Sequence, residues 1–260
     1  MKKIKKTVYF LALFTPYVCM CVAEEKLQFN NTPIEVTVGN QTFEMIPVEG
    51  CTPDSINGYV GLDSYYIAKT EVTQGLWEMV MGTNPSFFKS PVLPVENISW
   101  EDAQAFLTKL NEKTGKKFRL PTEFEWEFAA KGGNKSKGYK YSGGNKPESI
   151  SWNDFNSGDE THPVAQKQPN ELGIFDMSGN VEEWCDDIFF KVEKKEKKKN
   201  GEILTQRYLD VEVVKNTTKE HVLKGGSWSS RPNQCLIVAR RGSDFGNHKV
   251  GMRICMDAEE

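Results

Sequence analysis

Apolar and polar residues alternate in the N-terminal part of the chain in a way that predicts β-structure. Positions 34–38 and 42–48 alternate on either side of Gly39-Asn40, a dipeptide typical of tight turns between paired strands. We therefore expect these two segments to form a β-hairpin. The short apolar run at 65–68 predicts another strand.

Three segments further along have the apolar spacing of helices, and each begins at a residue that can cap a helix. The starts are Thr73, Ser99 and Thr122. The first segment ends at Gly82, and the second repeats apolar residues at helical spacing. Glu125 stands three residues after Thr122, which is the spacing of a capping box.

The helical period disappears after residue 132, where glycine, asparagine, proline and isolated aromatic residues dominate. Five of the six tryptophans lie between Trp77 and Trp184, which argues against disorder in this stretch. We expect ordered loops there, for which a bound metal is one means of support.

Residues 189–221 differ from the rest because lysines and glutamates alternate in them, followed by apolar pairs at 203–204 and 211–214 that could form a hairpin. A solvated insertion loop explains this segment better than a surface for an acidic partner.

Composition narrows the possible classes of protein. The chain has 260 residues, a formal net charge of -3 and 11% aromatic residues. The aromatic content excludes a disordered chain, and the near-neutral charge argues against a nucleic-acid partner. The pattern as a whole predicts one domain with one insertion.

The N-terminus resembles a secretory signal peptide. A basic start with four lysines precedes an apolar stretch at 8–20 and the small residue Ala23. We expect cleavage after residue 23 and export of the mature chain, with residues 24–41 forming a tail and the first strand. The apolar run is short for a membrane span, so an uncleaved anchor is the alternative, and no other segment could cross a bilayer.

Export changes how the cysteines are interpreted. The mature chain keeps Cys51, Cys185, Cys235 and Cys255, and an exported chain with four cysteines can form two disulfides in three possible pairings.

Six motifs occur in an order that resembles the formylglycine-generating enzyme, or sulfatase-modifying factor, family. They begin at Thr70, Pro94, Phe118, Asp176, Lys224 and Gly251 and read TEVTQ, PVENISW, FRLPTEFEWE, DMSGNVEEW, KGGSW and GMR. The resemblance covers residues 42 to 256. It implies an α+β fold of the C-type-lectin type for the domain at 42–260, with several helices packed on small twisted antiparallel sheets and many ordered loops.

The resemblance also implies a calcium site. Asp176 and Glu183 would bind through carboxylates, and Gly179 and Val181 through main-chain carbonyls. Hard oxygen ligands of this kind suit Ca²⁺. The alternative is a capped turn in which Asp176 accepts hydrogen bonds from backbone amides.

The family's enzymes use two cysteines after the Gly-Gly-Ser motif to hold copper and to oxidise a sulfatase cysteine to formylglycine with O₂. The corresponding positions here are Ser230 and Cys235, and Ser227 matches the family's active-site serine. A serine hydroxyl cannot replace a thiolate as a ligand of copper(I). The copper centre is therefore incomplete.

Non-enzymatic relatives often carry cysteines at the positions of Cys185 and Cys235, so the resemblance favours a structural disulfide between them. Cys51 and Cys255 would then form the second pair. The alternative is a redox role for Cys235 with a nearby thiol.

Two functional hypotheses follow. The first is an exported binding module without formylglycine-generating activity, stabilised by calcium, with a ligand groove formed by Trp228, Arg231, Arg240 and Arg241. Its ligand would be a peptide, protein or glycan. The alternative is a formylglycine-generating oxidase with an altered copper centre, in which Cys235, Ser227 and Ser230 are catalytic.

Overall fold

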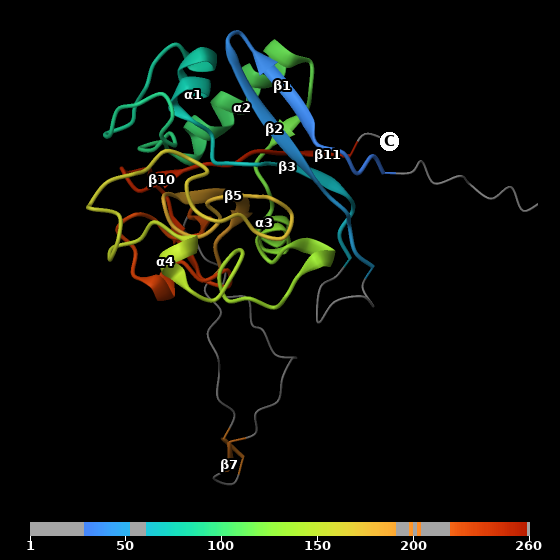
Figure 1. The fold of residues 1–260 in the computed structure, drawn as a ribbon, viewed down its shortest axis with the longest axis vertical. Helices are drawn as coiled ribbons and strands as arrows, with labels where there is room; N and C mark the ends of the chain where they lie inside the picture. The colour runs from blue at the N-terminus through green and yellow to red at the C-terminus, as the bar shows by residue number, and fades with distance from the viewer. Residues whose placement is uncertain (1–28, 53–60, 191–197, 200–201, 204–218, 259–260) are drawn as a thin grey trace, which may run out of the picture.

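The computed structural model describes residues 29–52, 61–190, 198–199, 202–203 and 219–258 (Figure 1). The expected signal peptide at 1–23 lies outside these residues. The strand expected at 211–214 lies outside them as well, and the short strand β7 (Glu202–Ile203) pairs instead with β6 (Lys198–Lys199).

The predicted hairpin begins the larger sheet. The strands of this sheet, in spatial order, are β1 (Ile34–Val38), β2 (Gln41–Val48), β3 (Tyr65–Ala68), β11 (Cys255–Asp257) and β4 (Phe118–Arg119). All four pairings are antiparallel, and Gly39 turns the chain between β1 and β2 with a φ of 61°. β11, late in the chain, therefore lies between β3 and β4 in a sheet that the N-terminal strands begin.

None of the four strands of the second sheet coincides with a strand expected from the sequence. Its order is β10 (Val250–Gly251), β5 (Glu182–Ile188), β8 (His221–Lys224) and β9 (Arg240–Ser243). β10 pairs in parallel with β5, and the other pairs are antiparallel. Two residues per strand, as in β10, are too few to show a period of two.

The three predicted helices are present where their capping residues place them. They are α1 (Gln74–Met81), α2 (Trp100–Thr114) and α3 (Glu123–Ala130). Ser99 and Thr122 each form a complete capping box, and Thr73 accepts a hydrogen bond from the backbone N–H of Leu76. Gly82 ends α1 in the left-handed conformation. The capping signals in the sequence therefore fixed all three starts.

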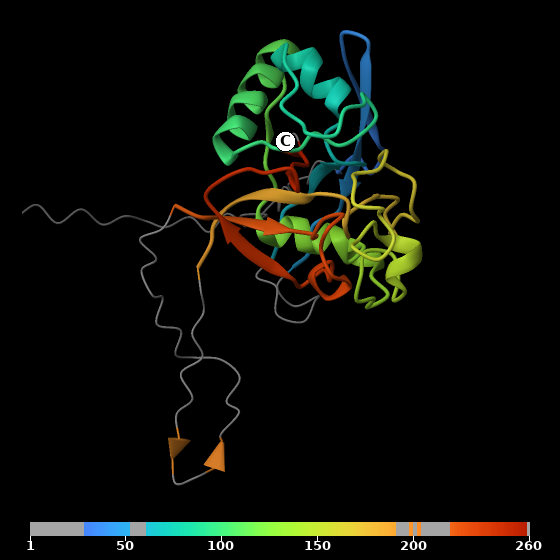
Figure 2. The ribbon, with the colours of Figure 1, turned by 90° about the vertical axis from the view of Figure 1, so that its left-hand side faces the viewer.

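The helices cover opposite faces of the first sheet. α1 and α2 pack together on one face (Figure 2). There the buried ring of Trp77 stacks on Phe106 with their centroids 4.9 Å apart. On the other face, Trp126 of α3 lies in one apolar cluster with Tyr65 and Ile67 of β3 and Val222 of β8. Alternate residues of β3 thus enter different clusters, which is the expected consequence of the period of two.

Between residues 131 and 181 the chain forms ordered loops, as expected. The only regular elements there, within the described residues, are η1 (Gly133–Lys135) and α4 (Pro147–Ile150). A further short helix, η2 (Pro232–Gln234), follows β8.

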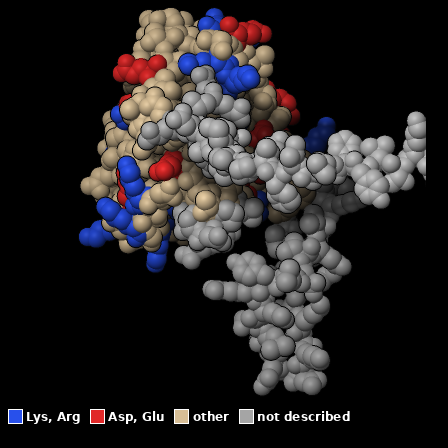
Figure 3. All heavy atoms as spheres, turned by 90° about the vertical axis from the view of Figure 1, so that its right-hand side faces the viewer, with Lys and Arg blue, Asp and Glu red and all other residues tan. Residues whose placement is uncertain are grey.

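No helix in the described part of the chain is long and apolar enough to span a bilayer. On the face drawn in Figure 3, basic side chains gather in separate groups, with acidic side chains between them.

The capping box of α2 can be tested directly. Because Ser99 Oγ accepts the N–H of Asp102 at 3.0 Å, Ser99→Ala should lower the free energy of unfolding by about 1 kcal/mol, and Ser99→Gly by only a few tenths. Urea denaturation of both variants measures this difference. Equal stability of the wild type and Ser99→Ala would show that the cap does not contribute.

Candidate functional site

A buried ion pair joins the two sheets below the loops. Arg253 and Glu183 have fully buried side chains, and Arg253 Nη2 lies 2.8 Å from Glu183 Oε1. The guanidinium also donates to the carbonyls of Ala68 and Phe175 at 2.8 and 2.7 Å. Trp126 Nε1 donates to the other Glu183 oxygen at 2.5 Å. Glu183 therefore has both oxygens in hydrogen bonds to protein groups.

Two further carboxylates share this interior. Glu71 accepts hydrogen bonds from Asn180 Nδ2 at 2.7 Å and from the N–H of Val181 at 3.0 Å. Its burial, together with the charges of Asp176 and Glu183, raises its pKa well above the usual value. Burial raises the pKa of Asp176 to about 6, although the N–H of Ala165 opposes this shift. We call Glu71, Asp176 and Glu183 the carboxylate cluster.

The structure thus brings Asp176 and Glu183, the two expected carboxylate ligands of calcium, into one cluster. Gly179 turns the chain between them with a φ of 88°, and a Cβ there would come within 2.2 Å of the carbonyl oxygen of Trp152. Within the described residues, no three acidic, histidine or cysteine side chains are placed to hold a metal. A calcium ion here would depend on the main-chain carbonyls of Gly179 and Val181.

Ser227 and Ser230 form a tight buried turn after β8. Ser230 Oγ accepts from the N–H of Ser227 at 2.9 Å, and the two hydroxyl oxygens lie 3.1 Å apart. The N–H of Asp154 donates to the Ser230 carbonyl at 3.1 Å, which ties the turn to the neighbouring loop. The hydroxyl of Ser230 is therefore part of the hydrogen bonding of its own turn.

Cys235 lies behind this turn. It is fully buried in a small apolar cluster with Tyr141 and Ile150. Burial, with the nearby charges of Glu182 and Asp154, raises the pKa of its thiol to about 12. A thiol in this environment is protonated at neutral pH and is a weak nucleophile and metal ligand.

The described residues contain neither of the expected disulfides, Cys185–Cys235 and Cys51–Cys255. All four are buried free thiols. Cys185 and Cys235 belong to different apolar clusters, the first beside Trp126 and the second beside Tyr141. The sulfur of Cys255 accepts a hydrogen bond from Arg119 Nη1 at 3.0 Å. Cys51 and Cys255 share the cluster of Cys185, so only Cys235 lies apart from the other three cysteines.

A pocket of about 350 Å³ opens in front of the serine turn. Its walls come from β5, the serine turn, β9 and the loop before β10: Glu182, Ser227, Ser229, Ser230, Gln234, Arg241, Asn247, His248 and Lys249. Arg241 Nε donates to Glu182 Oε1 at 2.6 Å, and its Nη2 donates to the other carboxylate oxygen. This bidentate pair neutralises the acidic side chain of the pocket.

The structure separates the four residues that were expected to line a groove. Arg241 lines the pocket, whereas Arg240 forms an ion pair with Glu123 at 2.8 Å on the other face of β9. Neighbouring residues of a strand point to opposite faces, so the two arginines cannot share one groove. Trp228 is buried beside the pocket, and Arg231 is exposed without lining it.

Several residues of the site were missed by sequence reasoning. Glu71 and Arg253 lie within two of the quoted motifs, yet nothing local shows that they meet at the carboxylate cluster. Asn247, His248 and Lys249 reach the pocket because the N–H of Asn97 donates to the carbonyl of Asn247 at 2.9 Å. Such a contact between distant segments leaves no periodic signal in the sequence.

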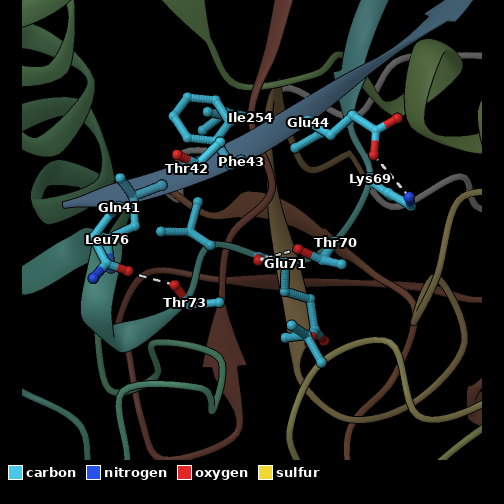
Figure 4. A pocket seen from close by; sticks show the side chains of 13 residues that line it. Gln41, Thr42, Phe43, Glu44, Lys69, Thr70, Glu71, Thr73, Leu76 and Ile254 are labelled. Atoms are coloured by element: carbon cyan, nitrogen blue, oxygen red, sulfur yellow. Dashed lines mark hydrogen bonds and ion pairs between the residues drawn. The ribbon is translucent and has the colours of Figure 1, made fainter. Parts of the chain in front are cut away.

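A second hollow of about 270 Å³ lies between β2, the segment before α1 and α1 itself (Figure 4). Lys69 and Glu44 form an ion pair at 2.7 Å on one side of it. The side chain of Glu71 points away from β2, toward Asn180 and Val181 (Figure 4). None of the residues expected from the sequence to be functional lines this hollow.

Two small sheets with few helices and long ordered loops define a C-type-lectin-like domain. The family profile described as "Sulfatase-modifying factor enzyme 1-like domain" matches residues 23–258. The chain therefore belongs to this family, as its motifs predicted.

Three similar proteins illustrate the range of the family. The chain is 36% identical to "Chaperone protein LppX" of Paenibacillus barcinonensis, over 77% of this chain and 85% of that one. It is 30% identical to the formylglycine-generating enzyme of Streptomyces coelicolor, over 70% of this chain and 59% of that enzyme. The solved structure of Treponema denticola variable protein 1 superposes with a TM-score of 0.72 at 30% identity, covering 87% of this chain and 99% of that one.

The state of the cysteines is open to a simple measurement. In the chain that begins at residue 24, we expect a thiol reagent to find no reactive cysteine in the native protein, because all four thiols are buried. After unfolding in guanidinium without a reductant, four thiols per chain should react. A count of two or none would instead show that disulfides form.

Proposed function

We propose that this protein is an exported, non-catalytic binding module of the sulfatase-modifying factor family. The observation that carries the proposal is the serine turn. Ser230 stands where the enzymes have their first copper-binding cysteine, and its hydroxyl is hydrogen-bonded to Ser227. Export rests on the signal-peptide pattern of residues 1–23.

The donors present do not fit a copper centre of the family's kind. Copper(I) prefers soft thiolate ligands, and this site offers one protonated thiol, Cys235, and one hydroxyl, Ser230. Cys185 does not replace the missing thiol, because it lies in a different apolar cluster. We therefore derive no oxidation step through copper.

The pocket that remains is suited to binding. Hydroxyl groups, the side-chain amides of Gln234 and Asn247 and cationic groups line an open cavity. His248 lines it too, but the described hydrogen bond of the Ser227 hydroxyl runs to Ser230 and not to this histidine. The similarity to a protein named a chaperone supports a polypeptide ligand. A peptide or protein is therefore the ligand we propose for this surface.

We also propose that calcium stabilises the module at Asp176, Gly179, Val181 and Glu183. Burial and the charge of Glu183 raise the pKa of Asp176, so a bound cation would favour its ionised form. Because Arg253 and Trp126 already bind Glu183, the carboxylate of Asp176 and the main-chain carbonyls would supply most of the ligand field.

The catalytic question has a direct test. A peptide carrying a sulfatase-type cysteine is incubated with the chain from residue 24, copper(I) and oxygen, and formylglycine is measured by mass spectrometry. We expect no product from the native protein or from Ser230→Ala. The variant Ser230→Cys should gain copper(I) binding because it supplies a second thiol. Product from the native protein would refute the binding-only function.

Calcium binding has its own test. At a free calcium concentration about 100 times the Kd, binding should add about 2.7 kcal/mol to the free energy of unfolding and raise the Tm by roughly 5–10 °C relative to EGTA. Asp176→Ala should lose this shift, whereas the control Asp244→Ala, at an exposed position, should keep it. An unchanged Tm of the native protein in calcium and EGTA would exclude the site.

A further inference from the structure

Four rings lie in contact at the edge of the pocket. Phe87 and Phe88 meet edge to face with centroids 5.0 Å apart, and Phe88 meets Trp228 edge to face at 5.6 Å. His248 lies 5.8 Å from both Phe87 and Trp228. We call these four residues the aromatic shelf. Because His248 also lines the pocket, the shelf and the pocket form one continuous surface.

The outermost ring of the shelf is held in solvent. Phe87 is 70% exposed. A buried carboxylate nevertheless fixes the backbone N–H groups of Phe87 and Phe88. Glu96 Oε1 accepts from the N–H of Phe87 at 2.5 Å and from that of Phe88 at 2.9 Å. Glu96 is fully buried, and its Oε2 has no partner.

Burying a carboxylate with one oxygen unsatisfied destabilises the fold, so the arrangement costs free energy. The hydrogen bonds to Glu96 fix the positions of Phe87 and Phe88, which belong to none of the apolar core clusters. The buried ring of the shelf, Trp228, is fixed by a different contact, because its Nε1 donates to the carbonyl of His248 at 3.0 Å. A surface whose side chains are held in advance loses less conformational entropy when it binds a ligand.

The charge beside the shelf is positive. Lys249 lines the pocket and places its Nζ 5.7 Å from the centroid of the Trp228 ring. Among the residues that the structure describes, no carboxylate lies within ion-pair distance of Lys249, and Glu182 is already paired with Arg241. An anionic group entering the pocket would therefore meet an uncompensated ammonium group.

We propose that the aromatic shelf and the pocket together bind a peptide segment in which an aromatic side chain stands next to an acidic one. The aromatic ring packs on Phe87 and His248, and the carboxylate reaches Lys249. Ser229 and Asn247 supply polar groups for the peptide backbone. A volume of about 350 Å³ accommodates one or two side chains. This inference rests on the proposed binding function and names the class of its ligand.

Three acetylated octapeptides in a glycine-serine background test the ligand class by calorimetry. Their central residues are Tyr-Glu, Tyr-Lys and Ser-Glu. An aromatic contact contributes about 0.5–1.5 kcal/mol, so the Tyr-Glu peptide should bind about two- to tenfold more tightly than Ser-Glu. The Tyr-Lys peptide should bind more weakly than either, because its ammonium group meets Lys249.

Variants on the protein side separate the two contacts. Phe87→Ala should bring the affinity for Tyr-Glu down to that for Ser-Glu, and it should not affect folding because the ring is exposed. Lys249→Glu should reverse the preference in favour of Tyr-Lys. Matched controls are Phe124→Ala on α3, where the ring is 53% exposed, and Lys109→Glu on the exposed side of α2. Both controls should bind like the native protein.

Equal affinity for the three peptides, or binding of a neutral oligosaccharide in their place, would overturn the inference. These results are distinguishable from failure of the proposed function. Oxidation of the cysteine peptide by the native protein defeats the non-catalytic assignment, whereas the octapeptides test only the ligand class.

Discussion

The buried guanidinium of Arg253 is the contact on which the domain depends. It reaches the end of β3 in one sheet, Glu183 of β5 in the other, and the carbonyl of Phe175 in the loop between them. α3 packs in one apolar cluster with strands of both sheets, which joins their cores on that side. A charge held this deeply is stabilising only while all its partners are present, because removing one leaves the other charge buried and unpaired.

The same interior also positions the functional surface. Glu71 accepts hydrogen bonds from the side-chain amide of Asn180 and from the backbone N–H of Val181. The carbonyl of Asn180 in turn accepts the N–H of Trp228, next to the serine turn. The interior thus supports the serine turn, in which the hydroxyl of Ser230 bonds to its own turn. The fold can stay the same while the residues of the site change, because a fold does not by itself determine a function.

Local chemistry explains what the sequence could predict. The capping residues Thr73, Ser99 and Thr122 act within one turn of the chain, so the helix starts were predictable. β5, β8 and β9 were not, because each is defined by a neighbour far away in sequence. In the site, Ser227 lies in a motif, Ser230 was located by its position after that motif, and Arg241 was expected to line the groove. Lys249 and Phe87 were not, because loop contacts such as that of Asn97 with Asn247 bring their segments to the pocket.

The pairing of Ile188 with His221 has a consequence for how this fold can diversify. The lysine-rich insertion leaves the domain at one of these residues and returns at the other, and the two lie opposite each other on adjacent strands. The ends of the segment are therefore already closed by the sheet, and lengthening a loop adds only a slowly growing entropic cost. The ends of β5 and β8 at Ile188 and His221 are therefore a place where an insertion can lengthen at little cost to the domain.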